Sequence, residues 1–201
     1  GPQDFSEAKR LYGLAAAQGH AIAQYNFGLM YHQGQGGPQD FSEAKRLYGL
    51  AAAQEHAGAQ YNLGLMHYKG QGGPQNVDEA RRLLGLAAAQ GHAGAQLNLG
   101  LLHCRGDGGP RHFSEAKRLL GLAVAQGDAG AQYSLGCMHD AGQGGPQDFA
   151  EAGRLYGLAA AQGHEQAQAL LAREKERLAR LKADQVAMEL MTEEVGPQRD
   201  E

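Results

Sequence analysis

The chain has 201 residues, of which 42% are hydrophobic, 20% charged and 6% aromatic, a composition typical of a folded protein rather than a disordered one. Its net charge of -4 argues against a general nucleic-acid binder, because neutralising phosphates requires a basic surface. No apolar run approaches the ~18 residues that a membrane-spanning helix requires. No charged-then-apolar leader is visible either, which favours a cytoplasmic location.

A five-residue motif recurs along the chain at a fixed spacing. GPQDF begins at Gly1, Gly37 and Gly145, and its variants GPQNV and GPRHF begin at Gly73 and Gly109, so each copy starts 36 residues after the one before. A fixed period of ~20–50 residues is typical of a solenoid or propeller array. The pattern predicts an array over residues 1–164 whose units start at positions 1, 37, 73, 109 and 145.

The first half of each unit has the pattern of an amphipathic helix. Apolar residues of the first unit recur from Phe5 to Ala15 at a spacing near the helical period. Asp40 followed by Glu43 has the spacing of a capping box, whereas His112 at the same place in the fourth unit is a poorer cap. A glycine ends this helix in every unit but the second.

The second half of each unit reads as another helix that ends in a G-x-G-G-P turn. Glycine supplies positive φ in that turn and proline stops the helix. A further glycine recurs inside the helix, as Gly28, Gly64, Gly100 and Gly136, where it costs ~1 kcal/mol relative to alanine. We therefore predict that a neighbouring helix approaches closely there. Because one hairpin cannot bury its own apolar face, the units are expected to stack into an all-α solenoid.

The stretch from Ala59 to Gln96 resembles a Sel-1-like repeat, a relative of the tetratricopeptide repeat. The resemblance extends over about residues 1–168 and implies a right-handed superhelical α/α solenoid, an adaptor role in assembling protein complexes, and no catalytic residue. It rests on an A-x-x-x-L-G start, a G-x-G-x-P turn, one alanine after the turn and an A-A-x-x-G-x-x-x-A end: Ala59, Leu63 and Gly64; Gly70, Gly72 and Pro74; Ala80; Ala87, Ala88, Gly91 and Ala95.

The resemblance places the second helix of each unit on the inner, concave face. Near the end of that helix the otherwise similar units differ, either because partner specificity is encoded there or through neutral drift. Amide side chains on the same helix are suited to binding a peptide backbone, although they would equally satisfy local backbone groups or face solvent. The predicted partner-binding residues are Asn26, Tyr31, Asn62, His67, Tyr68, Asn98, His103, Arg105, Ser134 and His139.

Histidines recur at two unit positions, one of them beginning with His20 and the other with His67. Neighbouring helix axes lie ~8–10 Å apart, whereas zinc holds its ligand nitrogens at ~2.0–2.1 Å, so successive histidines are not expected to converge. We predict no metal site and no cofactor. Cys104 and Cys137 stand at different unit positions and are expected to be free thiols.

Leucines recur on the outer side of the first helix, as Leu14, Leu50, Leu86, Leu122 and Leu158. They form either an apolar stripe for association or, as we favour, a row partly covered by adjacent units. After Gly163 the turn glycines are absent, so residues 165–195 are expected to form an extended capping helix, followed by a frayed tail at 196–201. Its second half alternatively projects as a coiled-coil or partner-binding helix.

These patterns favour a non-enzymatic scaffold or adaptor that binds a protein or peptide segment on its concave face. The alternative is a structural module that self-assembles, for example as a homodimer, through its open N-terminal end, the outer leucines or the C-terminal helix. No nucleophile–base pair recurs, and no phosphate-binding loop follows a strand pattern. Neither nucleic-acid binding nor membrane insertion is expected.

Overall fold

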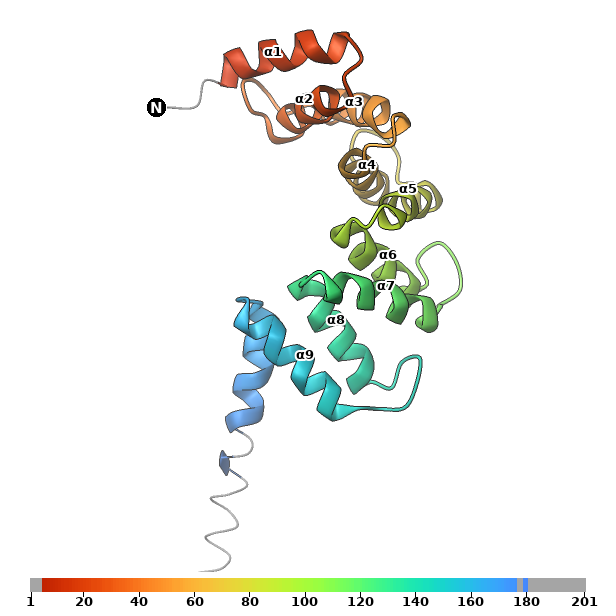
Figure 1. The fold of residues 1–201 in the computed structure, drawn as a ribbon, viewed down its shortest axis with the longest axis vertical. Helices are drawn as coiled ribbons and strands as arrows, with labels where there is room; N and C mark the ends of the chain where they lie inside the picture. The colour runs from red at the N-terminus through yellow and green to blue at the C-terminus, as the bar shows by residue number, and fades with distance from the viewer. Residues whose placement is uncertain (1–4, 177–178, 181–201) are drawn as a thin grey trace, which may run out of the picture.

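A computed structural model describes residues 5–176 and 179–180, which form a stack of antiparallel helices and contain no strand. Figure 1 shows the helices following one another around an arc, with α4, α6 and α8 towards its inner side. The predicted all-α solenoid is confirmed. Its helices are α1 (Phe5–Ala17), α2 (Ala21–Gln33), α3 (Phe41–Ala53), α4 (Ala57–Lys69), α5 (Val77–Ala89), α6 (Ala93–Arg105), α7 (Phe113–Ala125), α8 (Ala129–Asp140) and α9 (Phe149–Ala161). Another helix occupies residues 165–176; most of the predicted extension to 195, and the tail, lie outside the described residues.

The odd-numbered helices α3, α5 and α9 begin at side-chain caps. Asp40 accepts a hydrogen bond from the backbone N–H of Glu43 at 3.0 Å, and Asn76 and Asp148 cap α5 and α9 in the same way. His112 makes no such bond at the start of α7, as predicted. The helices therefore start where the sequence pattern places them.

The expected capping box is only half formed. Glu43 binds the guanidinium of Arg46 at 2.6 and 2.8 Å instead of returning to the cap. The backbone N–H of Asp40 donates to the carbonyl of Tyr31 at 2.9 Å, which ties α3 to the end of α2. The backbone N–H of Asp40 thus bonds to the preceding hairpin, and Glu43 pairs with Arg46, three residues later on the same helix.

The even-numbered helices from α4 onwards begin with a cap that also joins two hairpins. His56 Nδ1 accepts from the N–H of Ala59 at 3.1 Å, and its ring stacks on Tyr25 of α2 at 4.5 Å. Where Asp128 replaces the histidine and caps α8 at 2.8 Å, Leu97 replaces the tyrosine. His56, His92 and His164 therefore cap their helices, whereas His20, the first member of the same series, makes no cap bond.

Interior glycines let successive hairpins approach closely. A Cβ at Gly28 would lie 2.8 Å from Cε1 of Tyr48, and one at Gly136 would lie 2.7 Å from Cε1 of Tyr156. In the two middle repeats a leucine replaces the tyrosine, and the distance is 3.0 Å. The predicted close approach is confirmed, and it explains why each repeat tolerates a glycine within a helix.

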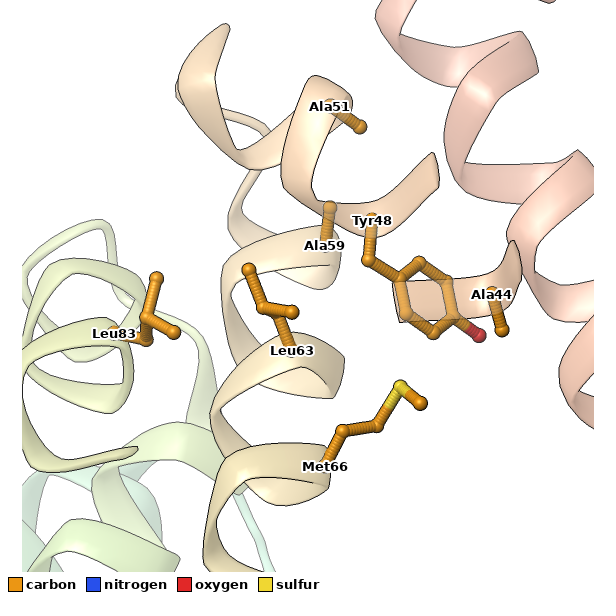
Figure 2. Packing of buried hydrophobic residues seen from close by; sticks show 7 residues of the cluster. All are labelled: Ala44, Tyr48, Ala51, Ala59, Leu63, Met66 and Leu83. Carbon is orange, nitrogen blue, oxygen red and sulfur yellow. The ribbon is translucent and has the colours of Figure 1, made fainter. Parts of the chain in front are cut away.

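The apolar core runs from one hairpin into the next. Figure 2 shows one cluster, in which Tyr48 of α3 and Met66 of α4 pack with Leu83 of α5. Tyr48 and Met66 are at most 1% exposed. Two similar clusters continue the core towards α9. Each hairpin therefore depends on its neighbours for burial, as expected of a solenoid.

A ladder of glutamines links three consecutive helices at each step. Gln96 of α6 is 3% exposed; its Nε2 donates to the carbonyl of Ala88 in α5 at 3.2 Å, and its Oε1 accepts from Gln126 after α7 at 2.8 Å. The same glutamine pair recurs at 2.7–2.9 Å between the other hairpins. These buried amides therefore bond to backbone carbonyls and to other glutamines of the array. For amides on this helix the sequence had left open either this role or the binding of a partner peptide.

Replacing Gln96 with alanine is expected to lower the free energy of unfolding by about 1–3 kcal/mol, because the buried carbonyl of Ala88 loses its partner. Gln126→Ala removes the other half of the same glutamine pair, but that side chain is exposed, so the expected loss is below about 1 kcal/mol. Chemical denaturation of the two variants measures the difference. Equal losses would show that the ladder contributes no more than an exposed contact.

Candidate protein-interaction surface

Tyr31, His67, His103 and His139 occupy one repeat position near the ends of the even-numbered helices, and their side chains are largely packed. The Nδ1 atoms of His67 and His139 are buried without a hydrogen-bond partner. Burial lowers the pKa of His67, with a smaller contribution from Lys45, so its ring is neutral at pH 7. Tyr31 packs against the ammonium of Lys9, 4.1 Å from the centre of its ring.

His103 lies beside the guanidinium of Arg81. Its Nδ1 is 3.5 Å from Nη2 of Arg81, and its ring centre is 5.8 Å from that of His112. Burial lowers the pKa of His103, and the nearby Arg81 lowers it further. Arg81 also donates to the carbonyl of Gly108 at 2.6 Å, so the cation holds the loop after α6.

The predicted amide and hydroxyl positions are half-buried, and two of the four bond to their own helix. Asn98 Nδ2 donates to the carbonyl of Gly94 at 2.7 Å, and Ser134 Oγ donates to that of Gly130 at 2.7 Å. Asn26 and Asn62 stand at the same repeat position in α2 and α4. At two of the four repeats, therefore, local backbone carbonyls already take the donors that were predicted to bind a partner.

Tyr68 and Arg105 are brought together across two hairpins. Tyr68 OH donates to Asp107 at 2.9 Å, and Nη1 of Arg105 lies 3.5 Å from the same hydroxyl oxygen. Arg105 is exposed. These two predicted residues form a joint polar surface, whereas most of the others are spread along the array one per repeat.

An aromatic seam formed by Tyr25, Tyr61 and Tyr133 was not predicted from the sequence. Each stacks on the histidine that begins the next even-numbered helix, at 4.5–4.6 Å. Tyr61 also lies against Gly94, where a Cβ would be 3.2 Å from its Cζ. The 36-residue recurrence of the tyrosines, and of the glycines after the histidines, was the signal that could have shown this seam.

A pocket of about 910 Å³ between α8, α9 and the helix at 165–176 was also not predicted from the sequence. This volume lies within the ~300–1,000 Å³ range of ligand pockets. Aromatic and aliphatic side chains line it together with carboxylates, among them Tyr133, Asp140, Phe149, Tyr156, Leu170 and Glu174. The helices that line it, α8, α9 and the helix at 165–176, form the lower end of the arc in Figure 1.

Two apolar surfaces are exposed on the odd-numbered helices. The outer leucines are 40–54% exposed, so adjacent units cover them only in part. In α1, Leu11 is 52% and Tyr12 37% exposed, whereas the equivalent Leu47 and Tyr48 of α3 are 2% and 0% exposed under α2. The end face of α1 is therefore open within the described structure.

The described residues were also compared with the requirements of a disulfide, a metal site and a membrane-spanning helix. Both cysteines are free thiols, as predicted. No group of three or more histidine, cysteine, aspartate or glutamate side chains within residues 5–176 and 179–180 is arranged to hold a metal ion. No helix in that part of the chain has the length and apolarity needed to cross a membrane.

The repeat architecture matches a known family model five times. The Sel1 repeat model matches residues 1–20, 21–56, 57–92, 93–128 and 129–164. The chain belongs to the Sel1 repeat family. In this model each full repeat pairs an even-numbered helix with the following odd-numbered one, the pair between which the interior glycines lie.

Solved structures show the same Sel1 solenoid. A protective antigen of uropathogenic Escherichia coli strains with an SLR fold is 32% identical, with a TM-score of 0.78 over 83% of this chain and 36% of that one. A Sel1 repeat protein from Oxalobacter formigenes is 35% identical, with a TM-score of 0.74 over 79% of this chain and 63% of that one. This chain therefore spans less than two thirds of the length of either.

A more distant structure supports the fold alone. An immunity protein from Pseudomonas aeruginosa is 23% identical, with a TM-score of 0.55 over 83% of this chain and 62% of that one. The search of curated proteins found no match to the Sel1 array. Sel1 repeat proteins are generally protein–protein interaction modules, and their solenoid is typically a non-catalytic scaffold.

Proposed function

We propose that this Sel1 array is a scaffold that binds a segment of a partner protein along its concave face. The observation that carries the proposal is the joint surface of Tyr68, Asp107 and Arg105, which spans two hairpins. An aromatic hydroxyl, a carboxylate and an exposed guanidinium placed together supply both donors and acceptors to a bound peptide.

Differences between otherwise similar repeats support this location. Position 68 is tyrosine, whereas the equivalent residues are His32, Cys104 and Asp140. The repeats thus keep one backbone but vary the side chains at the ends of their even-numbered helices. Among the predicted residues, Arg105 is exposed, whereas His67 and His139 each have a buried Nδ1.

The test is partner capture by the wild type and by a Tyr68→Ala/Arg105→Glu double variant, followed by calorimetric titration of the captured protein. Affinity is expected to fall about five- to thirtyfold, because the loss of one aromatic and one charged contact at an interface costs about 1–2 kcal/mol. Arg82→Glu makes the same charge change on an exposed side chain of α5 and is expected to leave binding unchanged. Equal losses in both variants would indicate only a general effect of charge.

A second candidate is self-assembly through the end face of α1. The exposed Leu11 and Tyr12 occupy positions that are buried wherever a preceding helix covers them. An apolar face of this kind is suited to docking another helix.

A further inference from the structure

Three arginines surround the loop that joins α6 to α7. Arg81 of α5 donates to the carbonyls of Gly108 and Asp107, at 2.6 and 3.4 Å. Arg111 donates from Nε to the carbonyl of Arg105 at 3.4 Å, and both of these arginines are exposed. The side chains of Arg81, Arg105 and Arg111, here called the loop arginines, therefore lie around one short loop, residues 105–111.

The loop arginines make no ion pair with a carboxylate in the part of the chain that the structure describes. Arginines on the exposed side of the odd-numbered helices differ in this respect. Each of them pairs with the glutamate three residues before it at 2.6–2.7 Å: Arg10, Arg46, Arg82, Arg118 and Arg154. The loop arginines thus keep positive charges that the described chain does not neutralise by direct pairing.

The positive charge is particular to this loop. At the position of Arg111 the other loops have a neutral amide, and at the position of His112 two of them have a carboxylate: Gln39, Gln75 and Gln147; Asp40 and Asp148. Arg105 stands where α2 ends in Gln33 and where Ala141 follows α8. A repeat that otherwise keeps the common pattern has therefore gained cations at two exposed positions of one loop.

The carboxylates near the loop do not cancel this charge. Asp107 accepts a hydrogen bond from Tyr68 OH at 2.9 Å. Asp78 of α5 lies beside the loop, where its Oδ1 would be 3.4 Å from a Cβ on Gly108. Glu115, which acts electrostatically on the nearby His103, is already paired with the arginine three residues later. The loop arginines thus outnumber the unpaired carboxylates, in a chain whose net charge is -4.

We propose that this loop binds an acidic segment of a partner protein, whose carboxylates pair with the guanidiniums of Arg105 and Arg111. A guanidinium is a planar fork that matches a carboxylate in a bidentate pair. Arg81 holds the loop carbonyls and so positions the site, and Tyr68, 3.5 Å from Arg105, borders it. The inference rests on the proposed function, because it names the chemistry of the partner segment, and it adds Arg111 to the surface.

The probe is a fluorescein-labelled peptide of repeated Glu-Glu-Leu-Gly units, and its control has glutamine in place of every glutamate. Saturable binding of the acidic probe to the whole chain is expected from fluorescence anisotropy, and the affinity should fall as salt is added, because salt screens exposed charges. The glutamine peptide is expected to bind about tenfold more weakly or less, since it cannot form charge-assisted pairs. No saturable binding of the acidic probe, or equal affinity for both peptides, would contradict the proposal.

Arg105→Gln/Arg111→Gln removes both exposed cations and installs the residues that the loop after α2 has at the same positions, so the melting temperature is expected to stay unchanged. This variant is expected to bind the acidic probe about tenfold more weakly, because two guanidinium–carboxylate pairs are lost. Arg10→Gln/Arg154→Gln removes the same number of charges from exposed arginines of α1 and α9 and should leave probe binding unchanged. Equal weakening in the two variants would show only an effect of net charge and would overturn the proposal.

Competition with a nucleic acid separates an acidic protein segment from a general polyanion. If a single-stranded oligonucleotide with the same charge as the probe displaces it equally well, the loop has no preference for carboxylates and the proposal is wrong. Continued binding of the probe in the presence of the oligonucleotide is the expected result.

Arg111→Gln alone distinguishes this inference from the proposed function, because Arg111 is not part of the surface that carries that function. A captured partner that Arg111→Gln binds as tightly as the wild type does, but that Tyr68→Ala/Arg105→Glu loses, would support the scaffold and contradict the acidic segment. Partner capture that Tyr68→Ala/Arg105→Glu leaves intact, together with probe binding that Arg105→Gln/Arg111→Gln abolishes, would support the acidic site and contradict the scaffold proposal at this surface.

Discussion

Replacing the half-buried helix glycines Gly49, Gly85, Gly121 and Gly157 with alanine is expected to raise the free energy of unfolding by about 3–4 kcal/mol. A Cβ at any of the four would meet no atom within 4 Å. Alanine is better than glycine in a helix interior by ~0.8–1.0 kcal/mol. The sites lie in different repeats, so their contributions should add. Chemical denaturation of the quadruple variant measures the gain.

The matched control makes the same substitution at the other interior glycines. Gly28→Ala/Gly136→Ala places methyl groups 2.8 and 2.7 Å from the buried rings of Tyr48 and Tyr156. Overpacking costs ~1–3 kcal/mol per site, against a helix-propensity gain of ~0.8–1.0 kcal/mol per site. The double variant is therefore expected to be less stable than the wild type, by up to about 4 kcal/mol. If the quadruple and the double variant both gained or both lost unfolding free energy, close packing would not explain the difference between the two sets of glycines.

The two glycine series show how far sequence reasoning reaches in this array. Both recur every 36 residues and both carry the same intrinsic cost in a helix. The sequence predicted close packing at Gly28, and the structure confirms it. At Gly49 the sequence indicated only an apolar outer side, and nothing within the described chain packs there. Periodicity thus shows that a position repeats, but only the stacking geometry shows what faces it.

The helices and turns were predictable because their signals are local. Caps such as Asp40 and the glycine turns lie within a few residues of the backbone groups that they satisfy. The glutamine ladder was not predictable from local signals, because Gln24 and Gln54 come from different hairpins and meet only when the hairpins stack. The same holds for the half-formed capping box, in which the N–H of Asp40 bonds across the hairpin contact.

The candidate site was less predictable than the fold for the same reason. His67 and His139 stood out because neighbouring residues vary, yet burial of Nδ1 depends on the next hairpin. The pocket could be seen in the sequence only as a loss of pattern: Gly153 and Glu174 depart from the other repeats, 21 positions apart. That their departures enclose one space follows from the packing of α9 against the helix at 165–176.

Leu83→Ala is expected to lower the free energy of unfolding by about 3 kcal/mol, whereas Leu11→Ala, at the same repeat position, should cost less than about 1 kcal/mol. Leu83 is 2% exposed in a core cluster, so its removal leaves a cavity that neighbours fill only in part. Leu11 is 52% exposed, so alanine there removes little buried area. Denaturation of both variants at low protein concentration provides the comparison.

The Leu11 variant also tests the self-assembly candidate. If a second copy covers the end face of α1 in solution, the cost of Leu11→Ala should rise with protein concentration, because association stabilises the folded state by mass action. Leu11→Glu should then abolish any concentration-dependent mass in sedimentation equilibrium, while Leu14→Glu, 54% exposed on the same helix, serves as the matched control. A cost that stays small at every concentration, with a constant mass, would leave the α1 face without a role in self-assembly and favour the scaffold proposal.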